Sequence, residues 1–163
     1  MNTTYLAFGS NLGDRDGSLQ RAIVMLAPEI TVTEVSQVYE TEPMYLEEQP
    51  KFLNMVVEAT TELSASEVFK KIKSIEKEIG RGDSLRNAPR VIDIDLLFYG
   101  NEVIETDELV VPHPKIAERP FVLVPLNDIA PDFVHPTLGV SIAELLKRLG
   151  NYHGVQLCSN SRE

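Results

Sequence analysis

Apolar residues along the first half of the chain form two kinds of segment, one typical of strands and one typical of helices. Segments 5–8, 30–41 and 52–61 are rich in β-branched and aromatic residues, which is typical of β-strands. Two other segments repeat apolar residues every three or four positions, which predicts amphipathic helices. The first carries Leu19, Ala22, Ile23 and Leu26, and the second carries Val68, Ile72, Ile75 and Ile79. The pattern therefore predicts the order strand, helix, strand, strand, helix.

Local signals mark where the second helix begins and ends. Ser64-Ala65-Ser66-Glu67 is a capping box, in which serine and glutamate side chains bond the first amides of a helix. Gly80 is a typical C-terminal cap. A further strand containing Asp93 and Asp95 completes the β-α-β-β-α-β order of a ferredoxin-like fold. We expect an α+β protein of this type, with an antiparallel sheet and both helices on one face.

Shorter elements are predicted after this core. Strands are expected at 102–104, 109–111 and 154–158, and helices at 115–129 and 141–149. The last helix begins with a second capping box, Ser141-Ile142-Ala143-Glu144. The chain length of 163 residues fits one domain that spans residues 1–163.

Asp93 and Asp95 interrupt an otherwise apolar strand. Because strand side chains alternate between faces, the two carboxylates share one face, roughly 7 Å apart. Two like charges in apolar surroundings are costly unless positive charge lies beside them. Mg²⁺ prefers oxygen ligands and would supply that charge. A solvated sheet face is the alternative interpretation of the pair.

Charge is distributed unevenly along the chain. The net charge of −10 argues against a general nucleic-acid-binding protein. Arg81, Arg86 and Arg90 nevertheless gather just before the acid pair. Guanidinium groups beside carboxylates at a strand end predict a site for a metal-bound polyphosphate. The sequence contains no G-x-x-x-x-G-K-[ST] motif, which excludes a P-loop kinase.

The lack of a recognisable targeting signal and the low cysteine content favour a cytoplasmic protein. The N-terminal Met1-Asn2-Thr3-Thr4 has neither the basic region nor the apolar core of a signal peptide. No apolar run approaches the roughly 20 residues of a membrane span. The single cysteine, Cys158, cannot form an internal disulfide and suits a reducing compartment.

Several short segments, distributed over nearly the whole chain, carry a family resemblance. They are Phe8-Gly9-Ser10-Asn11-Leu12-Gly13, Tyr39-Glu40-Thr41-Glu42-Pro43, Gln49-Pro50-Lys51-Phe52-Leu53-Asn54, Ile75-Glu76 with Gly80-Arg81, Pro89-Arg90-Val91-Ile92-Asp93-Ile94-Asp95-Leu96, Val111-Pro112-His113 and Arg119-Pro120-Phe121. In this order and spacing they resemble the 6-hydroxymethyl-7,8-dihydropterin pyrophosphokinases of folate biosynthesis.

The resemblance implies that a pyrophosphoryl group passes from ATP to the pterin alcohol and that AMP is released. Asp93 and Asp95 would hold two Mg²⁺ ions and act in catalysis together with Arg81 and Arg90. The ATP side would be lined by Glu76, Arg81, Arg90, His113 and Arg119. The pterin would stack between Phe52 and Phe121, and its remaining contacts would come from Thr41, Pro43, Met44 and Asn54. The partners would be these small molecules, with no nucleic acid or membrane, and the protein would be a monomer.

Each candidate also has a purely structural interpretation when it is taken alone. Phe52 and Phe121 could be core residues, and Asn54 a satisfied buried amide. The structural alternatives for the polar candidates are a turn residue for His113, a surface residue for Arg119 and a solvent-facing helical acid for Glu76. Two rival functions stay open as well. One is another Mg²⁺-dependent nucleotidyl- or phosphotransferase on the same fold, and the other is a non-catalytic ligand-binding module.

Overall fold

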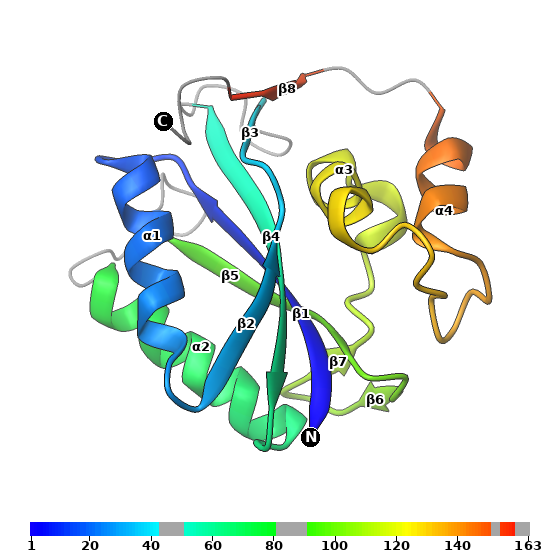
Figure 1. Cartoon of the computed structure of the whole chain (residues 1–163), viewed down its shortest axis with the longest axis horizontal. Helices are drawn as coiled ribbons and strands as arrows, with labels where there is room; N and C mark the ends of the chain where they lie inside the picture. The colour runs from blue at the N-terminus through cyan, green and yellow to red at the C-terminus, as the bar shows by residue number, and fades with distance from the viewer. Residues whose placement is uncertain (43–50, 81–90, 151–153, 159–163) are drawn as a thin grey trace.

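The computed structural model describes residues 1–42, 51–80, 91–150 and 154–158 (Figure 1). Its elements are β1 (Asn2–Ser10), α1 (Arg15–Leu26), β2 (Ile30–Val35), β3 (Tyr39–Thr41), β4 (Phe52–Thr61), α2 (Ala65–Ile79), β5 (Asp93–Tyr99), β6 (Ile104–Glu105), β7 (Val110–Val111), the 3₁₀-helix η1 (Ile116–Glu118), α3 (Pro120–Ile129), α4 (Ile142–Leu149) and β8 (Val155–Leu157).

The main sheet has the strand order β5-β1-β4-β3-β8, and β2 also pairs with β4. All of these pairings are antiparallel. β4 is long enough for β2 to pair with one half of it and β3 with the other. The predicted α+β fold with a ferredoxin-like core is therefore confirmed. β6 and β7 form a separate small sheet.

Helices cover both faces of the main sheet (Figure 1). α1 and α2 pack on one face, as predicted, and bury the side chains of Leu6, Phe8 and Ile94 against their own apolar faces. α3 and α4 pack on the other face, where they cover Tyr5 and Phe98. Because strand side chains point to alternate sides, β1, β4 and β5 contribute to both cores.

The capping box that the sequence predicts for α2 is present. The Glu67 amide donates to Ser64 Oγ at 3.1 Å, and the Ser64 amide donates to Glu67 Oε1 at 2.8 Å. At the start of α4 the serine half of the box is formed, because the Glu144 amide donates to Ser141 Oγ at 3.1 Å. The Glu144 carboxylate pairs instead with Arg148.

Two predicted elements are each divided in the structure. The strand expected at 30–41 is split into β2 and β3 around Ser36, whose hydroxyl accepts a hydrogen bond from the Val56 amide. The helix expected at 115–129 is interrupted at Arg119, which is extended, with φ −115° and ψ 99°. The ring of Pro120 disfavours a helical conformation in the residue before it. The prediction of a single uninterrupted element was therefore wrong in both places.

The remaining predicted strands are confirmed with shifted bounds. The strand expected at 102–104 occupies Ile104–Glu105, and the one expected at 109–111 occupies Val110–Val111. β8 pairs with β3 as an additional edge strand. None of the helices in the described part of the chain has the length and apolar character needed to cross a membrane.

Candidate active site

Asp93 and Asp95 lie on β5, the edge strand of the sheet, and face the side that α3 covers. Asp93 pairs with Gly9 of β1, and Asp95 pairs with Ala7. The neighbours of the two acids on this face are therefore a glycine and an alanine, which fill little space. Ile94 lies between the acids and is fully buried on the opposite face. The alternation of the strand thus gives one face to the core and the other to the carboxylates.

The same face continues across the sheet to an amide. Gly9 pairs with Asn54 of β4, and Thr41 of β3 pairs with Phe52. The Asn54 side chain is buried, and its Nδ2 donates to Thr41 Oγ1 at 2.6 Å. A Cβ atom at position 9 would lie 2.7 Å from Asn54 Oδ1, so any side chain there would displace the amide. Acids therefore lie on one side of Gly9 and amide and hydroxyl groups on the other.

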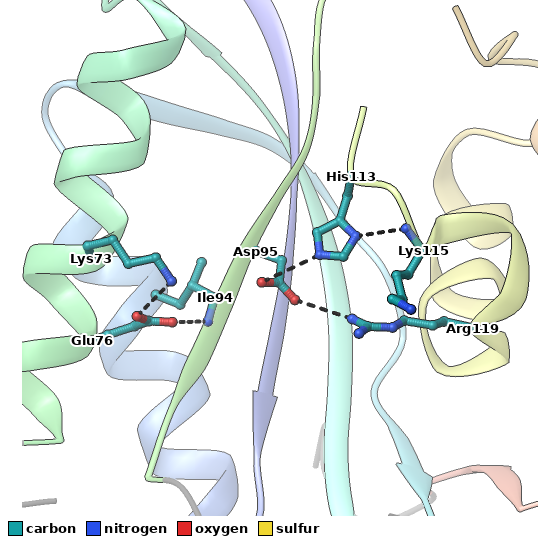
Figure 2. A network of polar contacts seen from close by, with 7 residues as sticks. All are labelled: Lys73, Glu76, Ile94, Asp95, His113, Lys115 and Arg119. Atoms are coloured by element: carbon teal, nitrogen blue, oxygen red, sulfur yellow. Dashed lines mark hydrogen bonds and ion pairs between the residues drawn. The ribbon is translucent and has the colours of Figure 1, made fainter. Parts of the chain in front are cut away.

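Two side chains from the segment between β7 and α3 approach Asp95 (Figure 2). His113 Nε2 lies 4.0 Å from Asp95 Oδ1, and Arg119 Nη1 lies 3.9 Å from Asp95 Oδ2. The His113 amide donates to the Leu97 carbonyl at 3.0 Å, which holds this segment against β5. The Arg119 side chain is only 16% exposed. A carboxylate, an imidazole and a guanidinium group thus meet at one end of the sheet.

His113 is neutral at pH 7. Burial, together with the nearby Arg119 cation, lowers the pKa of His113 to about 4. The Lys115 amide donates to His113 Nδ1 at 3.2 Å, so Nε2 carries the proton and faces Asp95. The 4.0 Å approach to Asp95 is therefore a polar contact of a neutral imidazole and not an ion pair.

Glu76 and Lys73 lie on the other side of β5, on α2 (Figure 2). The Ile94 amide donates to Glu76 Oε2 at 2.6 Å, and Lys73 Nζ lies 3.1 Å from Glu76 Oε1. An edge strand leaves amides without a strand partner, and the Glu76 carboxylate satisfies this one. Burial raises the pKa of Glu76, while the Ile94 hydrogen bond and the Lys73 charge oppose that rise. Glu76 thus holds the backbone between the two aspartates.

A cavity of about 190 Å³ opens beside β5, between α2 and β7. Lys73 and Asp95 contribute charge to its wall, and Leu96 and Val110 contribute apolar surface. His113 also lines it, so the cavity adjoins the carboxylate, imidazole and guanidinium groups. A wall of this kind suits a ligand that has both charged and flat apolar parts.

Phe121 and Phe52 are both only half-buried, unlike Phe8 and Phe98, which are enclosed in the two cores. Phe121 lies in the first turn of α3, where the Arg119 guanidinium carbon is 5.5 Å from its ring centroid. Phe52 begins β4, and its ring lies next to the open position at Gly9. Core packing therefore does not account for either ring completely.

The carboxylates of Asp93 and Asp95 suit a metal ion that takes its other ligands from water and from a bound phosphate. In the part of the chain that the structure describes, no three or more His, Cys, Asp or Glu side chains form a metal-binding group. Mg²⁺, however, is commonly bound by one or two carboxylates, with water and phosphate oxygens as its other ligands. Asp93 and Asp95 on one sheet face fit that donor set.

Comparison with known proteins decides the family. Residues 5–131 match the family model of 7,8-dihydro-6-hydroxymethylpterin-pyrophosphokinase, abbreviated HPPK. The chain belongs to the HPPK family. The solved structure of Plasmodium falciparum HPPK-DHPS with pteroate has a TM-score of 0.74 at 15% identity. The comparison covers 90% of this chain and 44% of that one, and it supports the fold.

HPPK relatives differ widely in length. The 2-amino-4-hydroxy-6-hydroxymethyldihydropteridine pyrophosphokinase of Bacillus subtilis is 46% identical over 130 residues, which is 78% of each chain. The folic acid synthesis protein FOL1 of Dictyostelium discoideum is 43% identical over 157 residues, which is 94% of this chain. The match spans only 24% of the FOL1 chain. The present chain thus corresponds to about a quarter of the longer relative.

The structure brings most of the predicted HPPK site residues to one end of the sheet. Asp93, Asp95, His113 and Arg119 gather on one side, and Thr41, Phe52 and Asn54 lie across Gly9. Phe121 borders this face from α3. Pro43, Met44, Arg81 and Arg90 lie outside the described residues.

Two of the structural interpretations are wrong. Arg119 is not a surface residue, because its side chain is 16% exposed beside Asp95. Glu76 is not a solvent-facing helical acid, because its side chain is 17% exposed and bonds to β5. Neither environment follows from the local sequence of these residues.

Gly9 and Lys73 lie at the candidate site, although the sequence analysis gave neither of them a role. Gly9 leaves room for the Asn54 amide, and a glycine within a strand is a known signal of close approach. Lys73 precedes Glu76 by three residues on α2, a spacing at which helical side chains meet. The spacing of Lys73 and Glu76 was visible in the sequence, whereas the strand expected at 5–8 ended before Gly9.

Proposed function

We propose that this protein transfers the β,γ-pyrophosphoryl group of ATP to 6-hydroxymethyl-7,8-dihydropterin in folate biosynthesis. The hydroxymethyl oxygen forms a bond to the β-phosphorus and loses its proton. The bond between the β-phosphorus and the oxygen that bridges to the α-phosphate breaks, and AMP leaves. The observation that carries this proposal is the acid pair of β5 beside His113 and Arg119, in a member of the HPPK family.

The charged side of the site would bind the polyphosphate. Asp93 and Asp95 would hold Mg²⁺, two ions in this proposal, and the bound metal would neutralise and orient phosphate oxygens. Arg119 lies 3.9 Å from Asp95, which supports a role in stabilising charge on the transferred group. Neutral His113 can donate a hydrogen bond from Nε2 to a phosphate oxygen. We assign no general base, because a metal-bound carboxylate is a weak one.

The remaining ATP contacts would surround this centre. The cavity between α2 and β7 adjoins Asp95 and His113, which supports it as the site of the nucleoside part of ATP. Glu76 would act on the ATP side through its bond to the Ile94 amide. Arg81 and Arg90, outside the described residues, would act in catalysis in this proposal and complete the ATP side.

The polar and aromatic side of the site would bind the pterin. Phe52 and Phe121 would stack on the two faces of the flat ring. Asn54 offers an amide oxygen and a second N–H beyond its bond to Thr41, which suits the amide-like edge of a pterin. Contacts from Pro43 and Met44 belong to the same proposal, although both lie outside the described residues.

We further propose that residues 1–163 act as a single domain, a cytoplasmic monomer whose partners are ATP and the reduced pterin. The net charge of −10 supports the absence of nucleic acid from this set. Analytical ultracentrifugation of the purified chain tests the monomer, with a dimer mass as the contradicting result.

An assay of AMP release tests the proposed reaction. We expect AMP to form from ATP and Mg²⁺ when the reduced pterin alcohol is present and not when it is omitted. A panel of other alcohol acceptors identifies the rival transferase, which would be active with one of them and inactive with the pterin. Binding of ATP without turnover of any acceptor would favour the non-catalytic module.

A further inference from the structure

Helix α3 is attached to the sheet near both of its ends. Beside the N-terminal end, Arg119 Nη1 lies 3.9 Å from Asp95 Oδ2. Near the C-terminal end, the Tyr39 hydroxyl lies 2.8 Å and 3.0 Å from the two carboxylate oxygens of Asp128 and donates to them. The Gln37 amide also donates to Asp128, at 3.4 Å. Asp128 thus bonds α3 to β3 and to the residues just before it.

Tyr39 shares its strand and its sheet face with the polar side of the site. It pairs with Asn54 and lies two residues before Thr41, so these three side chains face α3. α3 carries Phe121 in its first turn, roughly 10 Å along the helix axis from Asp128. The Tyr39–Asp128 bond therefore joins the strand that bears Thr41 to the helix that bears Phe121.

The first turn of α3 lacks one backbone hydrogen bond and a side-chain cap. Pro125 lies within α3 and has no N–H, so it cannot donate to the carbonyl of Phe121 four residues earlier. Arg119, which precedes the helix, provides no side-chain cap. The position of Phe121 is therefore sensitive to where the rest of the helix is held.

A ring between Phe52 and Phe121 would respond strongly to a small displacement of α3. Dispersion contacts lose about a quarter to a half of their strength when a gap of 0.5–1 Å opens. The polyphosphate side lies beside β5, where the Arg119–Asp95 contact holds the other end of the helix. A displacement at Asp128 would therefore affect the two substrates unequally.

We propose that Tyr39 and Asp128 form a positioning pair, which holds α3 at the distance from β3 that a pterin ring requires. This inference rests on the proposed function, because it takes the pterin between Phe52 and Phe121 as the ligand. Tyr39 and Asp128 act through the position of Phe121 and do not touch the substrate. Loss of the pair weakens pterin binding and leaves nucleotide binding unchanged.

The test uses the full chain with Tyr39→Phe, Asp128→Ala and the double variant. Titration calorimetry measures the Kd of a non-hydrolysable ATP analogue with Mg²⁺, and then the Kd of the pterin alcohol on the saturated complex. We expect each single variant to raise the pterin Kd about fivefold, the size of one lost hydrogen bond. The double variant should bind the pterin no more weakly than Asp128→Ala, because that single variant already removes the bond between the two side chains. The Kd of the ATP analogue should change by less than about twofold.

Asp132→Ala is the matched control, because it removes the same side-chain carboxylate from an exposed residue just beyond α3. It should leave both affinities unchanged. In the kinetic assay, the positioning variants should raise the KM for the pterin more than they lower kcat. If the bond were merely structural, its loss would instead weaken the affinities for both substrates alike.

Two results would overturn the positioning pair while leaving the proposed function intact. One is an active enzyme whose pterin Kd is unchanged in both single variants. The other is a parallel loss of pterin and nucleotide affinity. Absence of AMP release from the unmodified protein would reject the proposed function and this inference together. The activity of the unmodified protein thus distinguishes the two failures.

Discussion

The two faces of the sheet use the same strands for different purposes. On the face that α1 and α2 cover, β1 and β5 contribute Phe8 and Ile94, which are 1% and 0% exposed. On the opposite face, the same two strands contribute Gly9, Asp93 and Asp95. Successive residues of these strands therefore point alternately into the core and toward the candidate site. Substitutions on the two faces should separate stability from activity.

The second face also has a core, and the site begins where that core ends. Tyr5, Val56 and Phe98 pack beneath α3 and α4. The next residue of β4 on the same face is Asn54, the amide of the site. Ala7 and Gly9 likewise follow Tyr5 along β1. The helical layer thus supports one end of this face and leaves the other end for ligands.

The largest effect is expected at the acids. Asp93→Ala or Asp95→Ala should lower kcat by about a thousandfold, because each removes a carboxylate proposed to hold the metal. Circular dichroism should remain that of the unmodified protein, since both side chains lie outside the cores. Asp132→Ala is the control for loss of a negative charge. Full activity, or loss of the dichroism signal, would refute the metal assignment.

A change on the other face should produce the opposite outcome. Met55 adjoins Asn54 in sequence but is fully buried against α1 and α2. Met55→Ala should lower the free energy of unfolding by about 3 kcal/mol, through lost burial and a new cavity. Urea unfolding measures this loss, and kcat well below the transition should stay within about twofold. A fall in kcat comparable to that of the acid variants would contradict the separation of the faces.

Phe121→Ala should distinguish the two substrates. Loss of a stacking ring should weaken pterin affinity about tenfold and change ATP-analogue affinity by less than about threefold. Calorimetry with each ligand provides the comparison. Equal losses for the two ligands would contradict the stacking role.

The smallest effect is expected at Glu76, which supports the acid strand from the opposite side. Glu76→Ala should lower kcat several-fold and speed hydrogen exchange of the Ile94 amide, because that amide loses its acceptor. Glu76→Gln keeps an oxygen acceptor and should restore most of both properties. Nuclear magnetic resonance of the Ile94 amide checks the bond directly. If Glu76→Gln behaved like Glu76→Ala, the charge of Glu76 would be what matters and its hydrogen bond to the Ile94 amide would not.

Most of the fold could be predicted because its signals are local. The apolar period of α2 and its Ser64–Glu67 capping box are contained within a few turns, and both are confirmed. The break at Arg119 also had a local cause in Pro120, so the continuous helix expected there was avoidable. The split of 30–41 had no such signal, because it depends on how Ser36 meets Val56 of another strand.

The site could be predicted less completely because it joins distant segments. The family resemblance named His113 and Arg119, but their approach to Asp95 depends on the path of the chain between β7 and α3. The tie between Tyr39 and Asp128 joins residues that are 89 positions apart. No local pattern predicts such a pair, since neither residue is unusual in its own segment.

By itself, the sequence determined that Asp93 and Asp95 share a face, because strand alternation is a property of neighbouring residues. It also determined the order of the main strands and helices, apart from the two divided elements, and, through its motifs, the family. The tertiary structure alone decided that Gly9 separates the acids from Asn54, because cross-strand register depends on pairing between distant segments. It also decided that α3 covers this face, because a helix packs on whichever side of the sheet can bury its apolar residues.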